Sequence, residues 1–318
     1  MDFTALNSVV ATLFLIMVVG FICRKLGVID DVASKKLSKL ILSVGQPAMI
    51  INALSKAEYS SENLKIAGIM VVAGFVFHVV LYLLSRLISL PLKKNLDEQK
   101  ITELSMIFAN CAFIGFPIFE ALLGSTGLFL ASFLTVSFNV LFWTLGLGIF
   151  ARGRSDIKIT VKKVLLNFGT VPCVIGFVFY LLKHPAINFT LPKFASDTLQ
   201  YLNNLCTPVS VLIIGSLIAT QSFKKIICSW KIYYVNLIKL IALPVVIALI
   251  CKICHVPQLY AVFFSAAAAL PIASSVTMLS ENYGLDAGYS SLCVGTTSLI
   301  SVLTLPLTMT FVQWIFAI

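Results

Sequence analysis

The feature that most constrains this chain is a series of uncharged, apolar stretches, each close to the length of a membrane span. Residues 3–23, 66–85 and 164–182 contain no Asp, Glu, Lys or Arg, and residues 121–151 form a longer uncharged run. A helix needs about 20 apolar residues to cross the hydrocarbon layer of a bilayer. The runs do not alternate polar and apolar residues as barrel strands do. The pattern therefore predicts an all-α polytopic membrane protein.

Composition supports this class and excludes others. Hydrophobic residues make up 59% of the 318 residues, charged residues only 11%, and the mean hydropathy is +1.01. A soluble domain has about a quarter charged residues and needs polar side chains to cover its surface. A soluble enzyme, a disordered chain and a secreted disulfide scaffold are therefore excluded. The net charge of +10 comes without a basic cluster interleaved with aromatic residues, so it does not predict nucleic-acid binding.

Ten transmembrane helices fit between the charged residues. They divide into an N-terminal half, residues 1–152, and a C-terminal half, residues 163–318, each with five spans. An odd number of spans per half makes the second half enter the membrane from the opposite side, which is the geometry of an inverted repeat. The predicted spans are residues 4–23, 36–55, 65–88, 102–123, 127–151, 163–182, 197–219, 229–251, 257–280 and 288–316.

The basic residues predict the orientation. Seventeen of the 23 Lys and Arg residues fall in the loops after spans 1, 3, 5 and 7. Cytoplasmic loops carry an excess of Lys and Arg, so these four loops should be cytoplasmic. The chain is then a multi-pass protein of the cell membrane with both termini extracytoplasmic. The loop after span 9 departs from the pattern because it contains only Glu281 and Asp286.

Prolines occur at matching places in the two halves. Pro47 and Pro208 lie in the second span of each half, and Pro117 and Pro271 interrupt the fourth. A proline removes a backbone donor and clashes with the preceding turn. Broken helices in matching positions of inverted halves predict a midplane binding site. We expect half-helices to begin near Pro117 and Pro271 and to present partly positive N-terminal ends to an anionic ligand.

Three motifs extend this interpretation: NCAFIGFPIFEALLG (Asn110–Gly124), LPIASSVTMLSENYGLDA (Leu270–Ala287) and SLISVLTLP (Ser298–Pro306). Here the chain resembles the auxin efflux carrier family, which includes plant auxin exporters and bacterial organic-anion permeases. The resemblance implies two inverted five-helix repeats, a scaffold of helices 1, 2, 6 and 7, and helices 4 and 9 that cross at their broken points. It also implies a homodimer and a carboxylate-binding site at Asn110, Gly115, Pro117, Pro271, Ala273 and Ser274.

Other polar residues within the predicted spans are further candidates. Ser275, like Ser274, lies in the first turn after Pro271, where a hydroxyl can cap the helix or contact a ligand. Gln46 could line the cavity from the scaffold side or make a structural hydrogen bond. The amide of Asn110 could bind a carboxylate or link two helices.

Three ionisable residues have two interpretations each. Lys239 could attract the anion or extend its stem to the membrane surface. Glu120 could carry a proton or simply reach the outer surface, and His78 could carry a proton or be a buried, hydrogen-bonded side chain. None of the three is assigned to substrate coupling by the sequence alone.

The predicted function is a secondary active transporter of a small organic anion such as malate, malonate or an auxin-like carboxylate, working by alternating access and coupled to H⁺, Na⁺ or the membrane potential alone. The alternative within transport is a sodium-coupled symporter resembling the bile-acid carriers. An ion channel and an intramembrane enzyme are rivals from other classes. No nucleotide-binding loop or catalytic motif is found, and no cofactor is expected. The C-K-I-C-H sequence at Cys251–His255 matches c-type haem attachment but ends a membrane helix.

Overall fold

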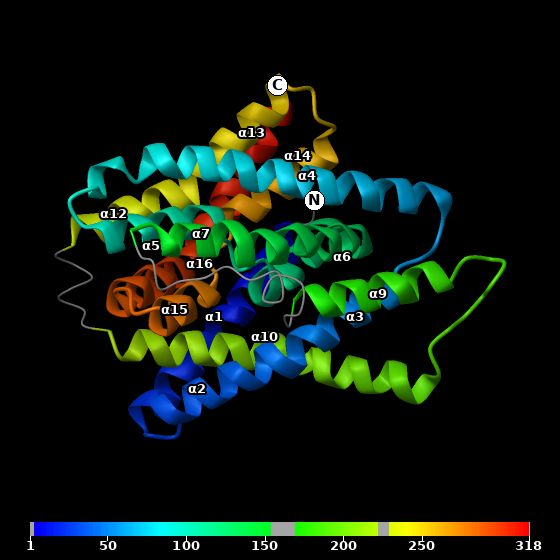
Figure 1. Cartoon of the computed structure of the whole chain (residues 1–318), viewed down its shortest axis with the longest axis horizontal. Coiled ribbons are helices and arrows are strands. Elements are labelled where there is room, and N and C mark those ends of the chain that lie inside the picture. The colour runs from blue at the N-terminus through cyan, green and yellow to red at the C-terminus, as the bar shows by residue number, and fades with distance from the viewer. Residues whose placement is uncertain (1–2, 154–168, 222–228, 318) are drawn as a thin grey trace.

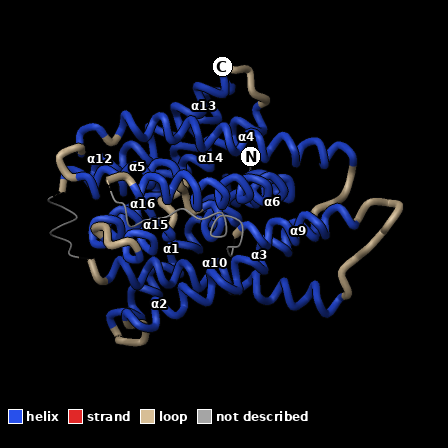
Figure 2. The backbone as a smooth tube through the Cα atoms, viewed as in Figure 1, coloured by secondary structure: helices blue, strands red, loops and turns tan. Residues whose placement is uncertain are grey.

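The computed structural model describes residues 3–153, 169–221 and 229–317, and in these residues every regular element is a helix. Figure 2 shows the helices joined by loops at their ends, and no strand is drawn. Among the described residues, seven continuous helical runs are long and apolar enough to cross a membrane. Three of these runs, Asp31–Lys56, Cys111–Ala151 and Trp230–Ile253, consist of more than one helical element. Two shorter apolar helices, Thr170–Leu182 and Gln258–Ala269, coincide with two more of the predicted spans.

The N-terminal elements are α1 (Phe3–Lys25), α2 (Asp31–Leu40), η1 (Ile41–Gly45), α3 (Gln46–Lys56), α4 (Ser61–Ile88), η2 (Leu90–Leu92), α5 (Leu96–Ile107), η3 (Cys111–Gly115), α6 (Phe116–Leu141), η4 (Phe142–Gly146) and α7 (Leu147–Ala151). The C-terminal elements are α9 (Thr170–Leu182), α10 (Lys193–Ala219), α12 (Trp230–Leu237), η5 (Ile238–Ala242), α13 (Leu243–Ile253), α14 (Gln258–Ala269), α15 (Ser274–Asn282) and α16 (Ala287–Ala317).

Several predicted spans are built from more than one helical segment. The second span is α2, η1 and α3 in series, and the eighth is α12, η5 and α13, so each contains one turn of π-helix. Pro47 lies at the start of α3, directly after the π-turn, whereas Pro208 lies inside an unbroken α10. The linker between the predicted halves falls largely on residues 154–168, outside the described residues.

The fourth span is interrupted, as the sequence predicts. Helix α5 ends at Ile107, and the backbone leaves the helical conformation at Phe108 and Asn110. The helix then resumes at Cys111, six residues before Pro117. The α-helix α6 begins at Phe116, next to Pro117 as predicted, and the π-turn η3 precedes it. Pro117 lies in the first turn of α6, directly after the π-turn η3.

The structure has a bend at Gly124, where the sequence predicts the boundary between spans 4 and 5. This residue has a φ of 61° and a ψ of −146° inside α6. Only glycine adopts that conformation without steric cost, because a side chain would clash with the backbone. The chain therefore changes direction at Gly124 without a loop.

In Figure 1, α2, α3 and α10 lie along one side of the molecule and α4 and α13 along the other, with α5, α15 and α16 between them. Helices α1 and α10 pack through glycines. A β-carbon on Gly20 would lie 2.1 Å from Leu212 O, and one on Gly215 would lie 2.0 Å from Met17 O. Small residues allow helix backbones to approach closely, which stabilises helix pairs in lipid. This pair is a tight, rigid unit.

A buried ion pair joins three other helices at the end of the bundle where the predicted cytoplasmic loops lie. The carboxylate of Glu103 in α5 is fully buried and accepts hydrogen bonds of 3.1 and 2.6 Å from the guanidinium of Arg152, which follows α7. Ser89, after α4, donates a third at 3.0 Å. Buried charges persist only when paired and hydrogen-bonded. The pair therefore links α4, α5 and α7 at this end.

We predict that Gly215→Ala lowers the thermal stability of the purified protein. The new β-carbon would overlap the Met17 carbonyl, and forcing two helices apart typically costs about 1–3 kcal/mol. The measurement is the melting temperature in detergent. Gly68→Ala is the matched control, because nothing lies within 4 Å of a β-carbon at Gly68. Equal melting temperatures for the two variants would contradict the packing described.

Candidate functional site

The two interrupted segments meet in the interior. Ala109 and Ile272 form an antiparallel bridge between the break that follows α5 and the break that follows α14. The backbone N–H of Asn110 donates to Pro271 O at 2.8 Å, and that of Ala273 donates to Phe108 O at 3.0 Å. Backbone groups in a membrane interior must find partners within the protein. Each break therefore satisfies some of the backbone hydrogen-bonding groups of the other. We call this contact, between residues 108–110 and 271–273, the crossing.

Asn110 organises the first half of the crossing. Its side-chain Oδ1 accepts a hydrogen bond from Phe113 N at 3.2 Å, so it caps the resumed helix, and its carbonyl accepts from Gly115 N at 2.9 Å. The residue is 3% exposed. Its amide Nδ2 has no hydrogen-bond partner among the described residues. A buried amide donor without a partner costs about 1–3 kcal/mol, so this atom is a natural contact for a bound ligand.

The second half of the crossing begins at Pro271. Pro271 lies in the interruption, as predicted, and α15 begins at Ser274 with Ala273 as an N-cap that offers no side-chain hydrogen bond. Ser274 and Ser275 are half-buried in its first turn. The helix start is therefore uncapped, and its N–H groups carry the partial positive charge of a helix N-terminus.

Gly115 packs closely against the segment that precedes the second break. A β-carbon there would lie 2.8 Å from Leu270 Cδ1 and 3.3 Å from Asn110 O. Ile272 N donates to Thr297 Oγ1 of α16 at 3.3 Å, which holds the second break from the other side. Four of the predicted site residues thus lie in the crossing or pack beside it: Asn110, Gly115, Pro271 and Ala273.

Lys239 approaches the crossing from η5. Its side chain is fully buried and does not reach the membrane surface. Its Nζ donates to Met106 O at 3.3 Å, in the last turn of α5. This carbonyl has no partner within its own helix, because α5 ends one residue later. Lysine at a helix C-terminus is electrostatically favourable. Lys239 therefore caps the helix end from which the first break begins.

His78 is a buried side chain behind the crossing. Its Nδ1 lies 2.7 Å from Gly74 O, one turn back in α4, so this nitrogen carries the proton. Its ring packs edge-to-face on Phe77 and lies 6.0 Å from the ring of Phe108, in the first break. The interpretation of a buried, hydrogen-bonded histidine agrees with this geometry, and His78 supports the segment that carries the crossing.

A polar cavity of about 530 Å³ lies between α3, α10 and the first part of α6. Pro117 and Glu120 line one wall, and Glu120 is exposed there. The opposite wall carries a chain of polar contacts: Asn52 Nδ2 donates to Gln200 Oε1 at 3.2 Å, and Gln200 Nε2 donates to Asn204 Oδ1 at 2.6 Å. Pro117 and Glu120 thus belong to this cavity, which begins two helical turns beyond Asn110.

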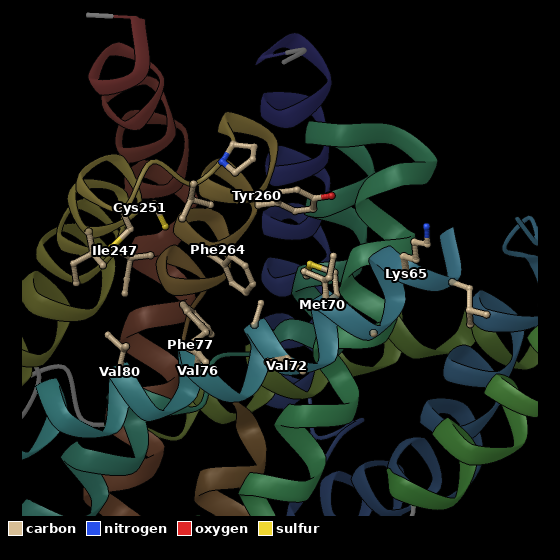
Figure 3. Close-up of a pocket in the computed structure, with 18 residues that line it drawn as sticks. Lys65, Met70, Val72, Val76, Phe77, Val80, Ile247, Cys251, Tyr260 and Phe264 are labelled. Atoms are coloured by element: carbon tan, nitrogen blue, oxygen red, sulfur yellow. The ribbon is translucent and has the colours of Figure 1, made fainter. Parts of the chain in front are cut away.

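Gln46 is buried at the start of α3 and is not among the residues that line the polar cavity. A separate groove of about 1080 Å³ lies between α4 and the α13–α14 pair, and its walls are apolar (Figure 3). Val72, Val76, Ile247 and Phe264 project into it, and Lys65 at one end is its one charged side chain. Such a surface is typical of lipid contact and offers no site for a carboxylate in its depth.

The sequence analysis missed two features, one at the crossing and one at the end of the bundle. Thr297 stabilises the second break from α16, and nothing in its sequence context distinguishes it from its helical neighbours. The Glu103–Arg152 pair was detectable in principle, because an acidic residue at one end of a span predicts a basic partner nearby.

The sequence is similar to those of known membrane transport proteins. The sequence model of the membrane transport protein family matches residues 6–309. An uncharacterized transporter of Methanothermobacter thermautotrophicus is 23% identical over 314 residues, covering 96% of this chain and 98% of the relative. An uncharacterized transporter of Methanocaldococcus jannaschii is 22% identical over 312 residues, covering 94% of this chain and 96% of the relative.

The family match spans both interrupted segments, all the apolar helices and nearly the whole chain. It confirms the resemblance that the motifs around Asn110 and Pro271 indicate. The chain is therefore a multi-span membrane transporter and belongs to the membrane transport protein family, the family of the auxin efflux carriers.

Proposed function

We propose that this protein is a secondary active transporter of small organic anions, such as malate, malonate or auxin-like carboxylates, and that the substrate carboxylate binds at the crossing. The observation that supports this most directly is the buried Asn110 Nδ2, an amide donor without a partner beside the uncapped start of α15. Both groups can donate to a carboxylate.

The electrostatics of the crossing favour an anion. Two helix N-termini, those of η3–α6 and of α15, converge on it, and each adds a partial positive charge. The Lys239 ammonium adds a full charge behind the first break. Glu120, the acidic candidate, lines the polar cavity and is not part of the crossing. A carboxylate can therefore bind at the crossing without meeting another carboxylate there.

We infer an alternating-access cycle from the position of the polar cavity. In the inverted-repeat arrangement, with halves 1–152 and 163–318, α1, α2–α3, α9 and α10 form the scaffold and the remaining helices form the moving bundle. The cavity lies between the scaffold helices α3 and α10 and the bundle helix α6. It serves as the vestibule of one state, and movement of α6 against α3 and α10 closes it and exposes the crossing to the other side. Gln46, Glu120 and His78 have no assigned role in this cycle.

The test is counterflow in proteoliposomes loaded with one carboxylate and exposed to labelled carboxylates of different size. We expect saturable exchange of at least one small dicarboxylate or aryl-acetate, and we expect Asn110→Ala to reduce it at least tenfold. Loss of a hydrogen bond to a charged group, worth about 1.5–3 kcal/mol, corresponds to this range.

Asn236→Ala is the matched control for that experiment. Asn236 is also a buried asparagine in a membrane helix, but its Nδ2 already donates to Ile232 O at 2.7 Å and to Thr296 Oγ1 at 3.0 Å. Its loss should lower stability and leave substrate affinity unchanged. Exchange of no carboxylate, or an Asn110→Ala variant with wild-type affinity, would refute the proposed site.

The proposed orientation predicts that Cys254 is extracytoplasmic. Cys254 directly follows α13 and is exposed, whereas Cys23 lies near the C-terminal end of α1. The proposed orientation places that end of α1 on the cytoplasmic side. In intact cells a membrane-impermeant maleimide should label Cys254, and Cys254→Ser should abolish that labelling. Cys23 should become reactive only after permeabilisation. The reverse order of labelling would show that the orientation is inverted.

A further inference from the structure

We propose that the Lys239 ammonium is a built-in cation that takes the place of a free coupling ion at the crossing, so that this carrier needs no sodium. The inference rests on the proposed function, because a coupling ion has a role only in a transporter. Its central test is independent of transport, because it measures cation binding without any carboxylate present. It begins from one unusual fact: a lysine near the middle of a membrane span with no exposed surface.

The first step is the environment of the ammonium. Its Nζ donates a hydrogen bond to Met106 O, at the C-terminal end of α5. Among the described residues no carboxylate lies within 4 Å of it, and the ionisable groups near enough to interact electrostatically are Cys111 and His78. A buried charge without a counter-charge is costly, so it persists where the site itself is electronegative. The helix end supplies that condition.

The second step is the charge of the break. The end of α5 leaves backbone carbonyls without helical partners, and a helix C-terminus carries about −0.5 elementary charge. Transporters with broken helices use such carbonyls and helix C-termini to coordinate Na⁺ or a proton carrier. In this chain an ammonium already occupies the position beside Met106 O. A tethered cation needs no uptake from solution.

The third step is the backbone that carries Lys239. It lies in the π-turn η5, and Thr308 Oγ1 of α16 donates to Leu240 O in the same turn at 3.0 Å. A π-turn shifts the register of the helix by one residue and commonly occurs at functional sites. Here the distorted turn is stabilised by a neighbouring helix and directs a charged side chain to the crossing. These features describe a site built around the ammonium.

The experiment compares melting temperatures of the purified protein in NaCl, in methylammonium chloride and in N-methyl-D-glucamine chloride at equal ionic strength. The wild type should melt at one temperature in all three. Lys239→Ala should melt lower in N-methyl-D-glucamine and recover by roughly 3 °C, saturably, with Na⁺ or methylammonium, because a small cation then fills the vacated position. Lys239→Gln, which keeps a neutral donor, provides the same test if the alanine variant is not obtained.

Lys252→Ala is the matched control. Lys252 Nζ also donates to a helix C-terminal carbonyl, Ile315 O at 2.6 Å, but the residue is exposed. Its variant should show no cation-specific recovery, because water already solvates the carbonyl.

Two results would overturn the proposal. In the first, the wild type melts higher in NaCl than in N-methyl-D-glucamine chloride, or exchanges carboxylate only when Na⁺ is present. In the second, the melting temperatures of the Lys239 variants do not depend on the cation. If the cation effect appears but no carboxylate is exchanged, the proposed function fails while the built-in cation stands. The two ideas are therefore separable.

Discussion

The rest of this structure depends on one constraint, the need to pair backbone groups where no water is available. Two helices stop inside the bundle, and each leaves carbonyl and N–H groups that lipid cannot satisfy. The exchange of hydrogen bonds between Asn110 and Pro271 and between Ala273 and Phe108 satisfies some of them. The groups that remain, the Asn110 amide and the start of α15, are the ones available to a ligand. The two breaks that must pair with each other are therefore also the place of the candidate site.

The charges around the crossing are arranged by the same logic. Helix N-termini point toward the side where an anion is proposed to bind, and the opposing C-terminus of α5 meets the Lys239 ammonium. The C-termini of α5 and α14 offset the two N-termini at the crossing, so the Lys239 ammonium leaves an excess of positive charge. The acidic side chains lie elsewhere, because Glu103 pairs with Arg152 and Glu120 lines the polar cavity. In a medium of low dielectric constant, such an imbalance acts strongly on a charged substrate.

Rigid and adaptable contacts are separated in space. The glycine-mediated packing of α1 against α10 brings two backbones into direct contact, which leaves little freedom for relative movement. The contact of α6 with α3 and α10, in contrast, encloses a polar cavity. Hydrogen bonds across a polar interface can be exchanged for bonds to water, whereas interlocked backbones must separate before they can move. This contrast supports the proposed division into a scaffold and a moving bundle.

The sequence alone determined the membrane class, the approximate span boundaries and the family, because apolar length, basic-residue placement and the motifs around Asn110 and Pro271 are local properties. It predicted a half-helix near Pro117, where α6 begins, but not that the chain leaves the helical conformation at Phe108 and Asn110 and re-enters it through a π-turn, because the position of a proline alone does not indicate where the preceding helix ends. Only the tertiary structure decided that the two breaks pair with each other, that Lys239 caps α5 instead of reaching the surface, and that Thr297 supports the second break. These are contacts between residues more than 20 positions apart, and no periodicity or spacing along the chain encodes which donor meets which acceptor.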